Sequence, residues 1–184
     1  MSHTDYYQRL MNEIHSHNVS VGWWDNTDKW TTTTKLMLTV SEVAEAMEGD
    51  RKNLMDDKVT TRKMLEVELA DTMIRLLDLG GFMKLNIDPN LQKRSAKIYY
   101  YYLKNFSEKV PVPVLLFQIV TAIVKLAESS GYEHELNHVI ATINAVCEYL
   151  ELDLKGAIVD KRYYNANRED HKRENRAKEN GKTY

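Results

Sequence analysis

The chain has 184 residues and a formal net charge of −2. This length suits one domain with a substantial core, and the balanced charge argues against a general electrostatic attraction to nucleic acid or an anionic membrane, so that any basic site must be local. The single cysteine, Cys147, excludes an internal disulfide framework and predicts a reducing, cytoplasmic location.

No apolar run approaches the length of a membrane span, and the polar amino terminus is unlike a signal peptide. Only seven glycines and three prolines interrupt the chain, and the alternation typical of strands is hard to find. We therefore expect an all-α protein that forms a single domain over residues 1–184.

The first predicted helix spans about 2–18, where apolar residues recur every four positions. Gly22 ends it and is followed by two adjacent tryptophans, Trp23 and Trp24. Adjacent side chains cannot share one face of a helix. Either both indoles fill the core, or one lines a pocket and stacks on a flat ligand such as a base.

A second helix is predicted over about 33–48 and carries the acidic pair Glu42-Val-Ala-Glu45. On a helical wheel this pair lies opposite an apolar stripe formed by Leu36, Val40, Val43 and Met47. Neither acid has a lysine or arginine four residues away, which is unusual for carboxylates on a solvated face. The pair is therefore more typical of a site than of ordinary surface.

A third helix is predicted from about 61 to 79, with a possible continuation through two glycines toward residue 85. It is apolar nearly all round, which is typical of the interior of a bundle. It carries a second acidic pair, Glu68-Leu-Ala-Asp71, and Arg75 follows four residues after Asp71. We expect Arg75 to neutralise part of the acidic charge.

Residues three apart on a helix share a face, so each acidic pair projects two carboxylates in one direction. If the two helices pack face to face, four carboxylates meet. Such a cluster repels itself and is costly to desolvate, so it needs cations. The sequence therefore predicts a Mg²⁺ site between these helices.

Residues 89–140 contain no group of acidic or other reactive residues that would form a site of this kind. Asp88-Pro89 predicts the start of a fourth helix, which includes four consecutive tyrosines and runs to about Tyr102. Apolar helices follow over about 114–127 and 133–150. We expect this segment to serve packing or oligomerisation, because its exposed tyrosines and apolar residues need partners.

The last predicted helix starts at Asp153 and places a cationic and polar face near the end of the chain. Its members are Lys161, Tyr164, Asn165 and Arg168. A lysine, an amide and an arginine without an acid among them suit phosphate oxygens, although a solvated helix end is an equal alternative. The charged stretch 169–184 is expected to fray or to order only on contact with a ligand or subunit.

These motifs together resemble the MazG-like branch of the all-α nucleoside triphosphate pyrophosphohydrolases, which is marked by an ExxE pair followed by an ExxD pair. Gly22-Trp23-Trp24-Asp25 is similar to phage-type members. The resemblance covers about 6–88 and 141–180, and 89–140 looks like an inserted helical segment. It implies a helical bundle and, for a phage-encoded protein, the host cytoplasm.

The resemblance also implies an activity, the hydrolysis of a (deoxy)nucleoside triphosphate to the monophosphate and pyrophosphate. Carried over, the Mg²⁺ ligands are Glu42, Glu45, Glu68 and Asp71, with Mn²⁺ as a possible substitute. One acid, Glu45 or Glu42, orients or deprotonates the attacking water. In this assignment the phosphates are bound by Lys161, Asn165 and Arg168. The sugar or base is contacted by Trp24 or Tyr164.

Two alternatives stay open. In the first alternative the chain is a helical interaction module that binds without catalysis. In the second it is a pyrophosphohydrolase that acts on a phosphoribosyl-nucleotide. If the chain is an enzyme of either kind, the expected partners are its nucleotide substrate and further copies of the chain in a homodimer or homotetramer. No nucleic acid and no membrane are expected as partners. Base preference depends on pocket shape, which the sequence does not supply.

Overall fold

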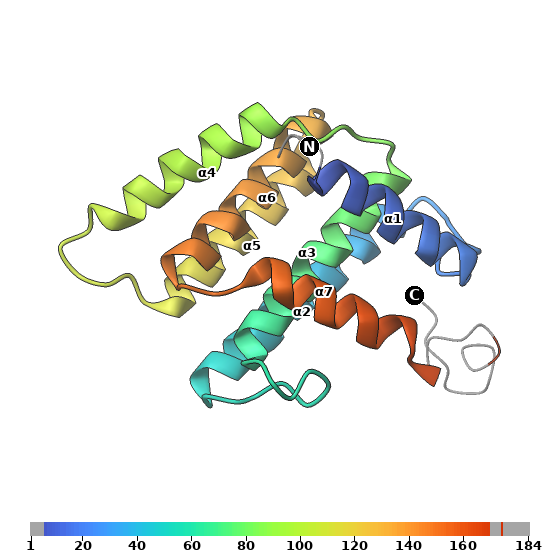
Figure 1. Ribbon diagram of the computed structural model, residues 1–184. Coiled ribbons are helices and arrows are strands. Elements are labelled where there is room, and N and C mark those ends of the chain that lie inside the picture. The colour runs from blue at the N-terminus through green and yellow to red at the C-terminus, as the bar shows by residue number, and fades with distance from the viewer. Residues whose placement is uncertain (1–5, 170–173, 175–184) are drawn as a thin grey trace.

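The computed structural model describes residues 6–169 and 174. This part of the chain forms seven α-helices and no β-strand, which confirms the predicted all-α class. The helices are α1 (Tyr6–Ser20), α2 (Thr31–Arg51), α3 (Met64–Phe82), α4 (Pro89–Lys104), α5 (Val112–Glu128), α6 (Tyr132–Tyr149) and α7 (Leu154–Ala166) (Figure 1). None of them is both long and apolar enough to cross a membrane. The expected tail, 169–184, lies almost wholly outside the described residues.

Three helices end in the same way, with a non-glycine residue in a left-handed conformation. Asn53, Lys84 and Glu151 follow α2, α3 and α6 with φ of 51°, 56° and 59°. The next residue is a leucine each time, and its N–H donates to the carbonyl five residues earlier at 2.9–3.0 Å. This left-handed turn satisfies carbonyls that the helix end leaves without partners.

The two glycines inside α3 are needed for close packing. A Cβ at Gly80 would lie 2.7 Å from Leu136 Cδ2 and 2.8 Å from Met11 Sδ, and one at Gly81 would lie 2.5 Å from the Cβ of His15. The missing side chains let α1 and α6 approach the backbone of α3. The helix therefore continues through both glycines, as the longer of the two predicted boundaries allowed.

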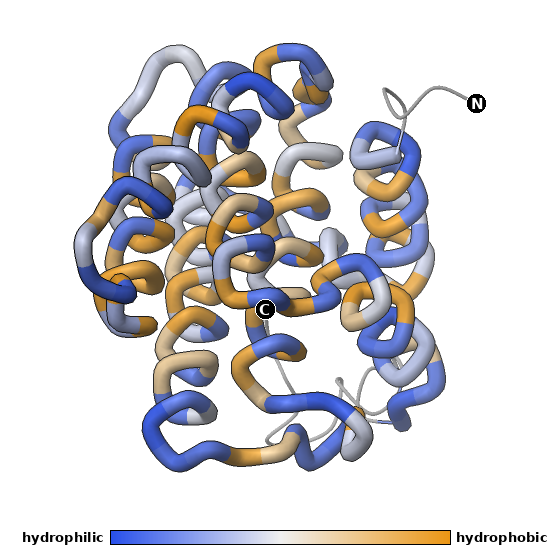
Figure 2. Tube along the Cα trace, turned by 60° about the vertical axis from the view of Figure 1, so that its left-hand side comes forward, coloured by the Kyte–Doolittle hydropathy of each residue, from blue (hydrophilic) through white to orange (hydrophobic). Residues whose placement is uncertain are grey.

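The helices form two sets of three around one core. In the first helical set α1 and α2 pack on α3, and in the second helical set α4 and α5 pack on α6 (Figure 1). Contacts of α2 with α5 and of α3 with α6 join the sets, and α7 lies against α3. Apolar and polar residues alternate around the helices, so that each has a side suited to the interior (Figure 2).

The segment 89–140 supplies a large part of this core. Leu115, Ile119 and Ile140 belong to the same buried cluster as Leu69 and Leu76 of α3. The predicted packing role of the segment is therefore confirmed, and it is continuous with the rest of the domain. Whether it is an insertion, and whether it also forms subunit contacts, stay predictions.

Candidate metal centre

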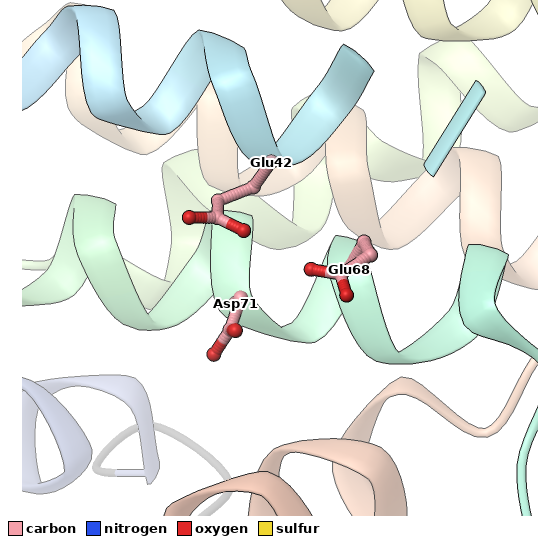
Figure 3. Close-up of side chains that lie close together, drawn as sticks. All are labelled: Glu42, Glu68 and Asp71. Atoms are coloured by element: carbon pink, nitrogen blue, oxygen red, sulfur yellow. The ribbon is translucent and has the colours of Figure 1, made fainter. Parts of the chain in front are cut away.

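Three carboxylates from two helices meet between α2 and α3. Glu42 comes from α2, and Glu68 and Asp71 come from α3 (Figure 3). Each offers an oxygen, and these oxygens all lie within 4.8 Å of one another. Glu42 and Glu68 are each only 5% exposed, and Asp71 is half-buried. We call these three residues the acidic triad.

Glu45, the fourth predicted ligand, lies at the solvent-exposed edge of the triad and is not part of it. Successive residues on a helix are rotated by about 100°, so positions three apart differ by about 60°. With Glu42 turned between the helices, Glu45 is turned toward solvent. Partial burial and the charge of Glu42 raise the pKa of Glu45, which shows that the two carboxylates influence each other.

Two cations of the same chain approach the triad. The Nε of Arg75 donates to Glu42 Oε1 at 2.6 Å, so Arg75 neutralises an acid across the helix pair. Lys161 of α7 is 4% exposed, and its Nζ lies 3.1 Å from Asp71 Oδ2 and 3.8 Å from Glu68 Oε1. The predicted cationic half of the site is thus reached within one chain, but Lys161 pairs with carboxylates here.

The triad remains short of positive charge in spite of these pairs. Burial, and then the neighbouring acids, raise the pKa of Glu68 to about 9 although Lys161 opposes the shift. Burial likewise raises the pKa of Asp71. Burial disfavours the charged form of Lys161, but Asp71 and Glu68 outweigh it and hold the pKa of Lys161 above its ordinary value. Further positive charge would therefore be favourable at this place.

Asn165 lies one turn after Lys161 on the same face of α7. Its Nδ2 donates to Asp71 Oδ1 in a long hydrogen bond of 3.4 Å, and its buried Oδ1 has no hydrogen-bond partner among the described residues. Farther along, the guanidinium of Arg168 lies over the ring of Tyr164 at 5.5 Å. The structure thus brings Lys161 and Asn165 to the acids, and places Tyr164 and Arg168 together beyond them.

An ion-pair network that the sequence analysis missed fixes α7 to the start of α3. The guanidinium of Arg62 donates to Asp160 at 2.6 Å, and to Glu66 and Asp153 at 3.2 Å each. Glu66 also accepts from the backbone N–H of Asp153 at 2.6 Å. Only the spacing of Arg62 and Glu66 is visible locally, because Asp153 and Asp160 lie 91 and 98 residues away from Arg62 in sequence. The network holds the helix that carries Lys161.

Trp24 is anchored by a second buried acid of α3, Asp78, which is 7% exposed. Asp78 accepts from the Trp24 Nε1 at 2.9 Å and from the Asn18 Nδ2 at 2.7 Å, and lies 2.9 Å from the Nδ1 of His15. Trp24 also stacks on Phe82, with ring centroids 4.3 Å apart. The half-buried indole of Trp24 thus packs on the core cluster, and its stacking on a ligand stays a prediction.

Comparison with known proteins identifies no relative: no family model, no curated protein and no solved structure matches the chain. The fold and the site nevertheless define a class, an all-α protein with a buried acidic triad. The oxygens of this triad are close enough together to hold a metal ion. Any more particular statement of function must rest on the residues and their geometry.

Proposed function

We propose that the protein hydrolyses (deoxy)nucleoside triphosphates to the monophosphate and pyrophosphate with the help of Mg²⁺. The observation that supports this most strongly is the acidic triad, because it joins buried oxygens from two helices and is short of positive charge. Mg²⁺ prefers such hard oxygen ligands and keeps waters and substrate phosphates in its shell. Mn²⁺ has similar ligand preferences and is expected to substitute.

Each residue of the site has a place in this reaction. The triad would hold the ion, whose charge would polarise the attacked phosphoryl group and stabilise the negative charge that develops on it. Lys161 and Asn165 lie on the α7 side of the triad, where they would bind phosphate oxygens. Glu45 lies at the exposed edge beside Glu42, where it would orient the attacking water and take its proton.

The nucleoside would extend along α3 toward Trp24. Asp78, which anchors Trp24, lies seven residues after Asp71, which is about 10 Å along a helix. The exposed portion of the indole would stack on the base, and Tyr164 of α7 with Arg168, which lies just beyond this helix, would contact the substrate. Water adds across the bond between the α and β phosphoryl groups, so that pyrophosphate leaves and the monophosphate keeps the new oxygen.

Product analysis tests this proposal directly. The protein is incubated with a panel of NTPs and dNTPs in Mg²⁺, and the products are separated by ion-exchange chromatography. Monophosphate and pyrophosphate in equal amounts are expected, and orthophosphate without pyrophosphate would contradict the proposal. Product formation should be lost in Glu42→Gln and kept in the matched control Glu48→Gln, because Glu48 is also on α2 but pairs with Arg51 and Lys52 outside the triad.

A non-catalytic helical module is the second candidate, and one observation favours it. Arg75 and Lys161 already neutralise part of the triad, so the acids could form a purely structural ion-pair network. Calorimetric titration with Mg²⁺ and a non-hydrolysable nucleotide separates the two. Heat that disappears in Asp71→Asn supports the metal centre, and no heat supports the structural network.

Self-association of the chain remains part of the proposal. Val114, Phe117 and Val124 of α5 are 45–66% exposed, and their spacing of three and seven residues places them on one face. A second copy would cover this face in a homodimer or homotetramer. Sedimentation that shows a monomer at micromolar concentration would contradict it.

A further inference from the structure

Helix α4 presents basic side chains that no acid accompanies. There is no Asp or Glu from Pro89 to Ser107, although the whole chain carries a net charge of −2. Leu103 is the one residue of α4 that is buried, and the helix lies at the outer edge of the second helical set (Figure 1). Its four cations, Lys93, Arg94, Lys97 and Lys104, are all exposed.

These cations differ from others in the described part of the chain. Arg51, Arg62 and Lys161 form ion pairs with carboxylates, whereas no described carboxylate pairs with a cation of α4. Positions 93, 97 and 104 lie within about 40° of one another around the helix. We call Lys93, Lys97 and Lys104 the lysine strip.

An exposed aromatic strip runs beside the lysine strip. Tyr101 is 56% exposed, Tyr102 58% and Ile98 64%, and Phe106, 49% exposed, continues the strip just beyond the helix. The two strips touch, because Lys97 Nζ lies 5.8 Å from the centroid of the Tyr101 ring. Aromatic rings with so much exposed surface, next to uncompensated cations, suit a partner that has both flat groups and negative charge.

We propose that α4 binds single-stranded nucleic acid, with phosphates on the lysine strip and bases stacked on the aromatic strip. A single strand exposes its bases for stacking, whereas a duplex hides them. Lys93 and Lys97 are separated by about 6 Å along the helix, so they can serve successive phosphates of an extended strand. Lys97 and Tyr101 lie close enough together to bind the phosphate and the base of the same nucleotide, which are joined by one sugar.

The balanced net charge of the chain is compatible with this site, because it argues only against a general electrostatic attraction of the whole protein to nucleic acid and leaves room for a local basic site. An anionic membrane fits less well, since a helix that lies in a membrane surface needs a broad apolar face and Ile98 is the one aliphatic residue of the strip. The surface belongs to the second helical set, away from the acidic triad. The proposal is therefore independent of nucleotide hydrolysis.

Fluorescence anisotropy tests the proposal with labelled oligo-dT and oligo-U of about 20 nucleotides, in EDTA and over a range of salt concentrations. Both single strands should bind, and a duplex of the same length should bind more weakly. The triple variant K93A/K97A/K104A should lower the slope of log K against log salt by about 2, or about 0.7 for each phosphate that the variant no longer binds. Y101A/Y102A should weaken binding at least about fivefold for each stacked base with little change in slope.

The matched control is K29A/K125A/K155A, which removes the same charge from three exposed lysines on other helices and loops. It should bind as the unchanged protein does. Equal losses of affinity in both triple variants, or no binding by the unchanged protein, would overturn the proposal. Binding to phosphatidylserine vesicles without binding to either oligonucleotide would overturn it in favour of a membrane surface. All substituted side chains are exposed, and melting curves verify that each variant folds.

Discussion

The two helical sets share an arrangement but differ in what their central helices bury. Both α3 and α6 are covered by two other helices of their own set. Helix α3 buries the carboxylates of Glu68 and Asp78, whereas α6 buries an amide and a hydroxyl, those of Asn137 and Thr142. Asp78 has three partners, so the difference lies in how Glu68 and the two buried groups of α6 are satisfied.

In the second helical set the buried polar groups find partners close by. The Asn137 Nδ2 donates to the carbonyls of Asn86 and Glu133 at 3.1 and 2.8 Å, and its Oδ1 accepts from the Asp88 N–H at 2.9 Å. Thr142 donates to the carbonyl four residues earlier at 2.9 Å. These bonds tie the start of α4 to α6 and leave nothing for a ligand to satisfy.

In the first helical set the acidic triad is left incompletely satisfied. Glu68 and Asp71 have raised pKa values, and the buried Oδ1 of Asn165 beside them has no described partner. Groups of this kind are found more often at functional sites than in ordinary cores. The same packing thus supports structure in one set and a candidate site in the other, and substitutions in each set should separate stability from activity.

The largest effect is expected from Glu42→Gln and Asp71→Asn. Each removes a proposed metal ligand, so turnover of the preferred nucleotide should be abolished. Stability in the absence of metal should fall less than in Lys161→Ala, because each variant removes one partner of an ion pair but also relieves repulsion within a cluster of like charges. Product assays and melting curves measure the two effects, and near-normal turnover in either variant would end the ligand assignment.

Lys161→Ala should have the largest effect on stability. Removing one partner of a buried ion pair typically costs about 3–5 kcal/mol, and Asp71 would lose its nearest cation. Because the proposed ion would replace part of that charge, Mg²⁺ should stabilise this variant more than the unchanged protein. Urea unfolding in EDTA and in Mg²⁺ measures this difference, and an equal response to Mg²⁺ would argue against an ion beside Lys161.

Asn137→Ala is the corresponding test in the second helical set. It should lower the free energy of unfolding by about 1–3 kcal/mol for each buried group left unpaired. Turnover should be unchanged at temperatures where the variant is folded. If turnover fell while stability held, the division between a structural set and a site-bearing set would be wrong.

Local features of the fold were predictable because neighbouring residues determine them. Asp88 caps α4 as its sequence indicates, accepting from the N–H groups of Asn90 and Leu91 at 2.9 and 3.1 Å. The spacing of Glu68 and Asp71 likewise fixes their common face, since both belong to one helix. Helix ends were less predictable where a non-glycine residue adopts a left-handed turn.

The wheel of α2 predicted an apolar stripe on one side and an acidic face packed against the next helix on the other. Both sides are interior, since Val43 of the stripe and Glu42 of the acidic face are 2% and 5% exposed. Both α3 and α5 cover α2, so more than one of its sides is interior. The approach of Lys161 to Asp71 could not be predicted in this way, because the two residues lie 90 positions apart and no local pattern links them.

The dependence of stability on pH tests whether the triad lacks positive charge. The pKa of Glu68 is raised from 4.5 to about 9, so between these values the folded metal-free chain holds a proton that the unfolded chain has lost. Stability in EDTA should therefore fall as pH rises through this window, by at most about 1.4 kcal/mol per pH unit for one proton. Urea unfolding from pH 6 to 9 measures the slope, and Glu68→Gln should flatten it.

Adding Mg²⁺ should reverse this pH dependence, because a bound ion displaces the proton of Glu68 and binds more tightly as protons become scarce. Stability in EDTA that instead rose with pH would mean that Arg75 and Lys161 already balance the triad. The buried acids of the first helical set would then be satisfied within the chain, as Asn137 is in the second. That result would favour the structural network over the metal centre.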